Sequence, residues 1–139
     1  MKIFIDVGSH FGETINEVIK HKYNFDLIYC IEPSLICINI LKKINDSRII
    51  IINAAFSDVD KESILYKSGE LGATIFENTK DDSFTETNTE KINLIKTSDW
   101  FKKNINSSDI VYVKLNCEES ECEIINDLII NNQLSSIFS

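Results

Sequence analysis

The sequence predicts an α/β fold in which helices cover both faces of a parallel sheet. Short apolar runs bounded by turn residues recur along the 139 residues, and segments with helical periodicity separate several of them. The runs are almost continuously apolar, which is typical of strands buried on both faces. Because 43% of the residues are apolar, the chain can bury one sizeable core, and we expect a single domain over residues 1–139.

Each element of this fold has its own signal. Five apolar runs are the expected core strands, at residues 2–7, 26–32, 48–56, 109–116 and 134–139. Segments with helical periodicity are the expected helices, at residues 13–21, 34–44, 98–104 and 119–130. Ser98 is the expected N-cap of the third helix, because its hydroxyl can accept a hydrogen bond from an unpaired backbone N–H.

The segment between residues 58 and 95 follows a different pattern. Short alternating stretches at 63–68, 72–76 and 91–96 predict a small β insertion. The polar, acidic tract over 78–91 predicts a mobile surface loop within that insertion. We therefore expect about five core strands with an added β structure beside them.

Charge and composition argue against several functions. The net charge of −8 argues against nucleic acid as a partner, because such proteins usually carry a basic stripe. Four cysteines without CxxC spacing predict reduced thiols, and the two histidines, His10 and His21, are too few for an ordinary zinc site, so no metal is expected. No apolar run approaches the roughly 20 residues of a membrane span, and no signal peptide is recognisable. We expect a cytoplasmic protein without a membrane partner.

The opening stretch "FIDVGSHFGET" predicts a ligand site. Asp6 and Gly8 stand where the first strand ends, and Gly12 stands where a helix begins. This strand–turn–helix arrangement directs backbone N–H groups and the positive end of the helix toward a ligand. Gly8 would permit the tight turn and Gly12 the close approach of the backbone, although such a spacing can also be a simple tight connection. The spacing D-x-G-x-x-x-G differs from the dinucleotide fingerprint G-x-G-x-x-G.

Glu32 is the second signal of a ligand site. It ends the second strand in "YCIEPS", where a carboxylate can accept hydrogen bonds from both ribose hydroxyls of an adenosine-type cofactor. The alternative is a carboxylate that lies near the next helix, which Ser34 could cap.

Four ordered blocks together resemble the FkbM-type methyltransferases, a branch of the class I enzymes that depend on S-adenosylmethionine (SAM). They are "FIDVGSHFGET", "IEPS", "NAAFSD" and "VKLNCEESECEII". The resemblance runs from Phe4 to about Leu128. It implies a Rossmann-like three-layer fold, SAM as cofactor, and methyl transfer to a hydroxyl of a sugar or another small molecule.

The resemblance also implies a cofactor site. The residues around the methionine part of SAM would be Asp6, Gly8, Ser9, His10 and Gly12, with Glu13 and Thr14 beside them. Glu32 would hold the ribose, and Pro33 and Ser34 would border it. The turn at Asn53, Ala54 and Ala55 would flank the adenine, and Asn116 would lie near the reacting methyl group.

The fourth block departs from the family pattern at two positions. The family usually reads Lys, Ile or Leu, Asp, any residue, Glu, Gly, any residue, Glu, whereas this chain has Asn116 for the aspartate and Glu119 for the glycine. Asparagine can position an acceptor but cannot accept its proton. His10 is the alternative base, because an imidazole accepts protons near neutral pH. Catalytic roles are therefore assigned to Asn116 and His10.

The resemblance also bears on the end of the sheet. A complete class I methyltransferase sheet has two further strands after residue 139, so we expect an incomplete sheet whose open edge permits self-association.

Two alternative functions remain. A non-catalytic SAM-binding module is the first, since Asn116 and Glu119 depart from the pattern. A nicotinamide-dependent oxidoreductase is the second, and it rests on the shared strand–turn–helix and Glu32 alone.

Overall fold

The computed structural model describes residues 1–66, 68–69, 73–75, 89–117 and 120–134. The elements follow in the order β1 (Lys2–Val7), α1 (Glu13–Lys20), β2 (Leu27–Ile31), α2 (Leu35–Leu41), β3 (Ile49–Ile52), β4 (Ala55–Ser57), β5 (Lys61–Tyr66), β6 (Thr89–Lys96), α3 (Thr97–Asn104), β7 (Ile110–Leu115) and α4 (Glu121–Ile130).

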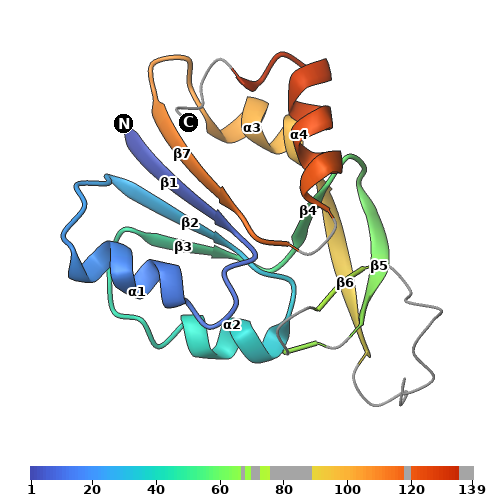
Figure 1. The fold of residues 1–139 in the computed structure, drawn as a ribbon, viewed down its shortest axis with the longest axis horizontal. Coiled ribbons are helices and arrows are strands. Elements are labelled where there is room, and N and C mark those ends of the chain that lie inside the picture. Colours follow the sequence, from blue (N-terminus) through green and yellow to red (C-terminus); the bar gives the residue numbers. More distant parts are fainter. Residues whose placement is uncertain (67, 70–72, 76–88, 118–119, 135–139) are drawn as a thin grey trace.

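The main sheet is parallel and has the strand order β3-β2-β1-β7 (Figure 1). The first strand therefore lies inside the sheet, and the chain crosses over to place β7 on its other side. In this register Asp6 of β1 is flanked by Cys30 of β2 and Lys114 of β7. The predicted parallel α/β sheet is confirmed, with four strands in the described residues.

Two apolar layers cover the main sheet. On one face, Phe4, Ile28 and Cys30 pack against residues of α1 and α2 such as Ile15 and Leu41. On the other face, alternate residues of β1, β2 and β7 pack against β4, α3 and α4; the buried members of this cluster are Ile3, Ile5, Val7, Tyr29, Ile31, Phe56, Trp100, Phe101, Val111, Ile124 and Leu128. The expected three-layer arrangement follows from this alternation of side chains.

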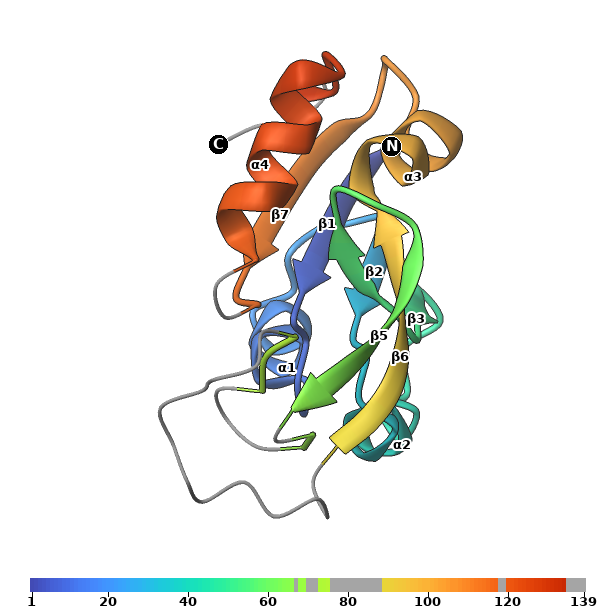
Figure 2. The same ribbon diagram turned by 90° about the vertical axis from the view of Figure 1, so that its right-hand side faces the viewer.

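A second sheet with the order β4-β6-β5 lies beside the main one (Figure 2). β4 is parallel to β6, and β5 is antiparallel to β6. Its apolar face buries Leu65, Ile92 and Leu94. The predicted β insertion is confirmed at β5 and β6. The loop predicted over 78–91 is wrong at residues 89–91, which belong to β6, and residues 78–88 lie outside the described residues.

The prediction of one strand over 48–56 is wrong. The chain bends at Asn53, so that β3 joins the main sheet and β4 joins the second one. The side-chain amide of Asn53 donates to the carbonyl oxygens of Glu32 (3.2 Å) and Pro33 (2.8 Å). These bonds hold the bend against the end of β2, an arrangement that an apolar run does not reveal.

The prediction of Ser98 as an N-cap is also wrong. Lys96 holds the N-cap position of α3, and Ser98 lies within its first turn. Asp127 of α4 accepts hydrogen bonds from the Ser98 backbone N–H (2.7 Å) and hydroxyl (3.0 Å), so a distant carboxylate caps α3. α4 begins at Glu121, and Glu118 and Glu119 lie outside the described residues. Of the strand expected over 134–139, Leu134 has 3₁₀ geometry and the rest is not described.

Candidate functional site

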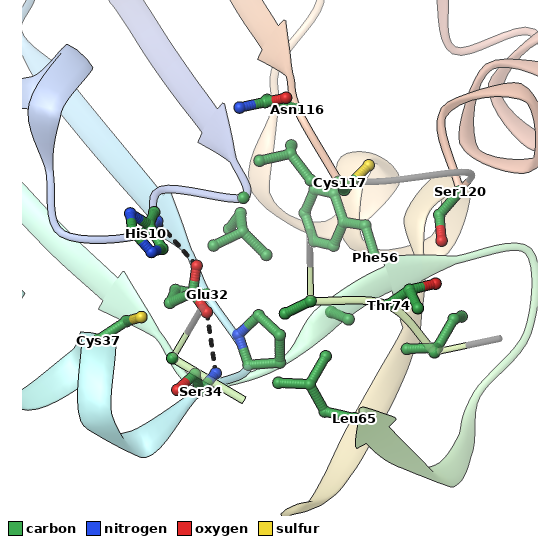
Figure 3. A pocket seen from close by; sticks show the side chains of 18 residues that line it. His10, Glu32, Ser34, Cys37, Phe56, Leu65, Thr74, Asn116, Cys117 and Ser120 are labelled. Atoms are coloured by element: carbon green, nitrogen blue, oxygen red, sulfur yellow. Dashed lines mark hydrogen bonds between the residues drawn. The ribbon is translucent and has the colours of Figure 1, made fainter. Parts of the chain in front are cut away.

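A cavity opens at the carboxyl ends of β1, β2 and β7 (Figure 3). It encloses about 740 Å³ when its open mouth is included. In open parallel sheets ligands bind at this edge, beside the strand where the chain order reverses. Seven of the predicted site residues line the cavity: Gly8, His10, Glu32, Pro33, Ser34, Ala55 and Asn116.

Gly8 forms the tight turn at the end of β1. Its φ is +77°, and the backbone N–H groups of Gly8 (2.9 Å) and Ser9 (3.3 Å) both point to the carbonyl oxygen of Ile31. A Cβ at Gly8 would lie 2.0 Å from the carbonyl oxygen of Asn116. The turn therefore requires glycine because the chain after β7 passes directly against it.

Gly12 has a different role from the one expected. A Cβ there would lie 2.7 Å from Cδ1 of Ile44 and 2.9 Å from Cδ2 of Leu41. The missing side chain thus lets the start of α1 pack against α2 and the residues after it, and Gly12 is not among the residues that line the cavity. The close approach is to an apolar layer of the fold.

Glu32 presents a fixed carboxylate to the cavity. Only 6% of the residue is exposed, and its two oxygens accept backbone hydrogen bonds from His10 (Oε2, 2.8 Å) and Ser34 (Oε1, 2.9 Å), both drawn in Figure 3. Burial raises the pKa of this carboxyl, and the two N–H donors oppose the shift. Since each carboxylate oxygen has two lone pairs, Glu32 retains acceptor capacity toward a ligand.

His10 lines the cavity in a left-handed conformation, with φ of 49°. Its Nδ1 lies 2.9 Å from Oε1 of Glu13. Because a carboxylate only accepts, Nδ1 carries the hydrogen and Nε2 of the neutral ring holds a lone pair. Nε2 is buried and has no hydrogen-bond partner among the described residues. Burial acts to raise the pKa of Glu13, but the hydrogen bond from His10 and those from backbone N–H groups outweigh it, so that the pKa is lowered.

Asp6 lies beneath the turn and not on the cavity wall. It is fully buried, and Nζ of Lys114 lies 2.9 Å from its Oδ1 across the β1–β7 pair. Its Oδ2 has no hydrogen-bond partner among the described residues. Burial raises the pKa of Asp6 even though the Lys114 ammonium lowers it.

The other predicted residues surround the site without lining the cavity. Ser9 is buried, and its hydroxyl donates to the carbonyl oxygen of Asp6 (2.8 Å). Ala54 is buried, whereas Asn53 supports the bend after β3 through its side chain. Glu13 and Thr14 belong to the first turn of α1.

Sequence reasoning missed the wall that the second sheet supplies. Phe56, Leu65, Ala73, Thr74 and Ile75 line the cavity, and they come from β4, β5 and the short segment that pairs with Tyr66 through Thr74. No local motif marks them, although their alternating pattern predicts strands. Their position at the cavity depends on how the second sheet packs against the main one.

Two thiols also line the cavity, Cys37 and Cys117. No disulfide joins the four cysteines, all of which lie in the described residues, in agreement with the expected reduced thiols, and Cys122 is exposed. Burial raises the pKa of Cys37 to about 11 and that of Cys30 to about 12. Thiols with such pKa values are poor nucleophiles at neutral pH.

In the described part of the chain, no helix is long and apolar enough to cross a membrane. Over the same ranges, no group of three or more His, Cys, Asp or Glu side chains could hold a metal ion.

Neither a protein-family model nor a curated protein matches this sequence. Among solved structures, the fold is similar to the crystal structure of methyltransferase FkbM from Methylobacillus flagellatus KT, with a TM-score of 0.56 and 14% sequence identity. The match covers 94% of this chain and 29% of that chain. At this identity the likeness shows a common fold, and the predicted Rossmann-like α/β class is confirmed.

Proposed function

We propose that the chain binds SAM and transfers its methyl group to a hydroxyl of a sugar or another small molecule. The observation that carries this proposal is the Glu32 carboxylate, which two backbone N–H groups hold at the cavity beside the Gly8 turn. A fixed anionic acceptor at the end of the second strand suits two ribose hydroxyls. The methyltransferase with a similar fold supports the same assignment at the level of the fold.

The cavity residues fit such a cofactor. Glu32 would accept hydrogen bonds from the ribose, and the apolar surface of Pro33, Ala55 and Phe56 would contact the flat base. Gly8 leaves room for the chain after β7, so that Asn116 lies against the Gly8 turn. The methionine part of SAM would bind at this turn. When bound, SAM supplies a methyl group on a positively charged sulfur, which a hydroxyl oxygen can attack.

An acceptor hydroxyl must lose its proton as it takes the methyl group. Asn116 can orient this hydroxyl through its amide but cannot take the proton. His10 is the residue we assign to that step, because Glu13 fixes its Nδ1–H and leaves the Nε2 lone pair without a described partner. Orientation and proton acceptance are the contributions that this reaction requires from the protein.

A second candidate function is SAM binding without methyl transfer. It is favoured by Asn116, which stands where the resemblance places an aspartate. The two functions share the cofactor site and differ only in the acceptor step. Turnover therefore separates them, whereas cofactor binding does not.

Isothermal titration calorimetry with SAM and with S-adenosylhomocysteine tests the shared site. We expect both compounds to bind and NADH not to bind. Binding of NADH is what the oxidoreductase alternative requires. A folded sample that binds neither SAM nor S-adenosylhomocysteine overturns the proposal.

Incubation with methyl-tritiated SAM and a panel of monosaccharides and phenols tests methyl transfer. Label in an acceptor rules out the non-catalytic function. Loss of this labelling in His10→Ala, with cofactor affinity retained, supports the role of His10.

A further inference from the structure

Glu90 interrupts the apolar face of the second sheet. Glu90, Ile92 and Leu94 occupy the same face of β6, because side chains alternate along a strand. Ile92 and Leu94 are buried, and the register places Glu90 opposite the buried Leu65 of β5. The hydrogen bonds that this carboxylate accepts from described residues all come from outside its own sheet.

The partners of Glu90 belong to the other side of the cavity. Its Oε1 and Oε2 accept the backbone N–H of Leu35 at 3.0 and 3.3 Å, and Oε2 also accepts the hydroxyl of Ser68 at 2.6 Å. Leu35 is the first residue of α2, which follows directly on the end of β2 through Pro33 and Ser34. Glu90 thus joins the second sheet to the start of α2.

A chain of hydrogen bonds leads from Glu90 to Glu32. The Ser68 hydroxyl donates its hydrogen to Glu90, so the Ser34 hydroxyl is the donor in the 2.9 Å bond between Ser34 and Ser68. The backbone N–H of Ser34 in turn donates to Oε1 of Glu32. Ser34, which helps to orient the Glu32 carboxylate, is therefore linked to Glu90 in two ways. Its hydroxyl is hydrogen-bonded to that of Ser68, which donates to Glu90, and the N–H of the next residue, Leu35, donates to Glu90 directly.

The same bonds hold the apolar wall of the cavity. Leu65, directly opposite Glu90 in the register, lines the cavity together with Ala73 and Ile75. Gly69, next to Ser68, also lines the cavity, and a Cβ on it would lie 3.1 Å from Cδ1 of Ile36 in α2. Without the Glu90 carboxylate, these hydrogen bonds between the second-sheet wall and the start of α2 would be lost.

We propose that Glu90 is a positioning residue that holds Glu32 and the second-sheet wall in register for the adenosine end of the cofactor. This role rests on the proposed function. It predicts that Glu90 acts on ligands that contain adenosine and that its effect depends on Glu32. A purely structural residue would lower stability without such a dependence.

The test compares Glu90→Ala with Glu62→Ala. The Glu62→Ala substitution also removes one carboxylate. Glu62 belongs to the neighbouring strand β5, and its exposed side chain lies on the other face of the sheet. Affinities for S-adenosylhomocysteine and for 5′-methylthioadenosine are measured by calorimetry, and a double-variant cycle combines Glu90→Ala with Glu32→Gln. Amide hydrogen exchange of the ligand-free variants, followed by NMR, reports on the Leu35 N–H.

We expect Glu90→Ala to weaken both ligands about tenfold, Glu62→Ala to change them less than twofold, and the double variant to bind about as weakly as Glu32→Gln alone. The Leu35 amide should exchange at least tenfold faster in Glu90→Ala. Wild-type affinity in Glu90→Ala, or independent effects in the cycle, overturn the positioning role while SAM binding stands. If the wild type binds neither ligand, the proposed function fails and the positioning role fails with it. Unchanged exchange of the Leu35 amide in Glu90→Ala separately contradicts the role of the hydrogen bond from Leu35 to Glu90.

Discussion

The backbone N–H of His10 donates a 2.8 Å hydrogen bond to Oε2 of Glu32, although the two residues are 22 positions apart. This bond ties the turn after β1 to the end of β2. It fixes the carboxylate before any ligand is present, so that little conformational freedom remains to be lost on binding. His10 makes this bond from a left-handed conformation, with φ of 49°.

Glu32→Gln should weaken binding of S-adenosylhomocysteine by at least about tenfold. A hydrogen bond to a charged group contributes roughly 1.5 to 3 kcal/mol, and the neutral amide cannot accept equally well from two ribose hydroxyls and two backbone N–H groups. Calorimetry measures the change, with Glu62→Gln as a control that should bind as the wild type does. Equal affinity of the two variants would mean that the ribose lies elsewhere.

The free energy of unfolding of Asp6→Asn, taken relative to that of the wild type, should increase as the pH rises. Burial raises the folded-state pKa of Asp6 above its ordinary value of 3.8. Between these two pKa values the folded state holds the proton and the unfolded state has lost it, so the wild type loses stability as pH increases through this window. Urea unfolding of both proteins at several pH values between about 4 and 7 measures the difference.

Asp46→Asn is the matched control for this pH dependence. Hydrogen bonds from Arg48 lower the pKa of Asp46 to about 2, so its contribution is lost only as the pH falls from 3.8 toward that value. Its difference from the wild type should therefore be flat between about pH 4 and 7. A flat profile for Asp6→Asn as well would contradict the predicted burial effect.

Gly8→Ala should reduce the free energy of unfolding by about 2 to 5 kcal/mol and abolish cofactor binding. A residue with a side chain costs about 1 to 2 kcal/mol in the left-handed region, and a forced contact adds about 1 to 3 kcal/mol. The contact here is with backbone, the Asn116 carbonyl oxygen, which cannot turn aside as a side chain can. Chemical denaturation and calorimetry measure the two effects.

Gly69→Ala provides the comparison for that prediction. Gly69 also has a positive φ, of 80°, but the nearest described atoms to its added Cβ belong to the side chain of Ile36, at 3.1 Å or more. We expect it to cost about 1 to 2 kcal/mol, the conformational part alone. Equal losses in the two variants would show that the close approach of Asn116 contributes nothing.

Asp127→Ala should destabilise the protein by about 2 to 4 kcal/mol. Asp127 is 5% exposed and accepts hydrogen bonds from the backbone N–H and hydroxyl of Ser98 and from the side chain of Asn131. Leaving a buried donor unpaired costs about 1 to 3 kcal/mol. Thermal or urea unfolding measures the loss, and the exposed Asn126→Ala should stay within about 0.5 kcal/mol of the wild type.

Much of the fold was determined by local pattern. The continuous apolar runs of β1, β2 and β7 and the helical periodicity of α1, α2 and α4 were recognisable in the sequence, because burial on both faces and amphipathic packing each leave a characteristic period. The same holds for part of the site. Gly8 and Glu32 stand at strand ends, and parallel strands bring their carboxyl ends to one edge of the sheet.

The tertiary structure alone decided the features that depend on distant partners. The run over 48–56 is apolar except for Arg48 and Asn53, and its division into β3 and β4 depended on the contact of Asn53 with the end of β2. Gly12 stands in a motif typical of ligand sites, yet its missing side chain makes room for Leu41 and Ile44. Likewise Asp127 caps α3 and Glu90 holds the start of α2. Sequence periodicity records how much of a residue is buried, whereas these roles depend on which residue is brought beside it, and that is decided only when the layers pack.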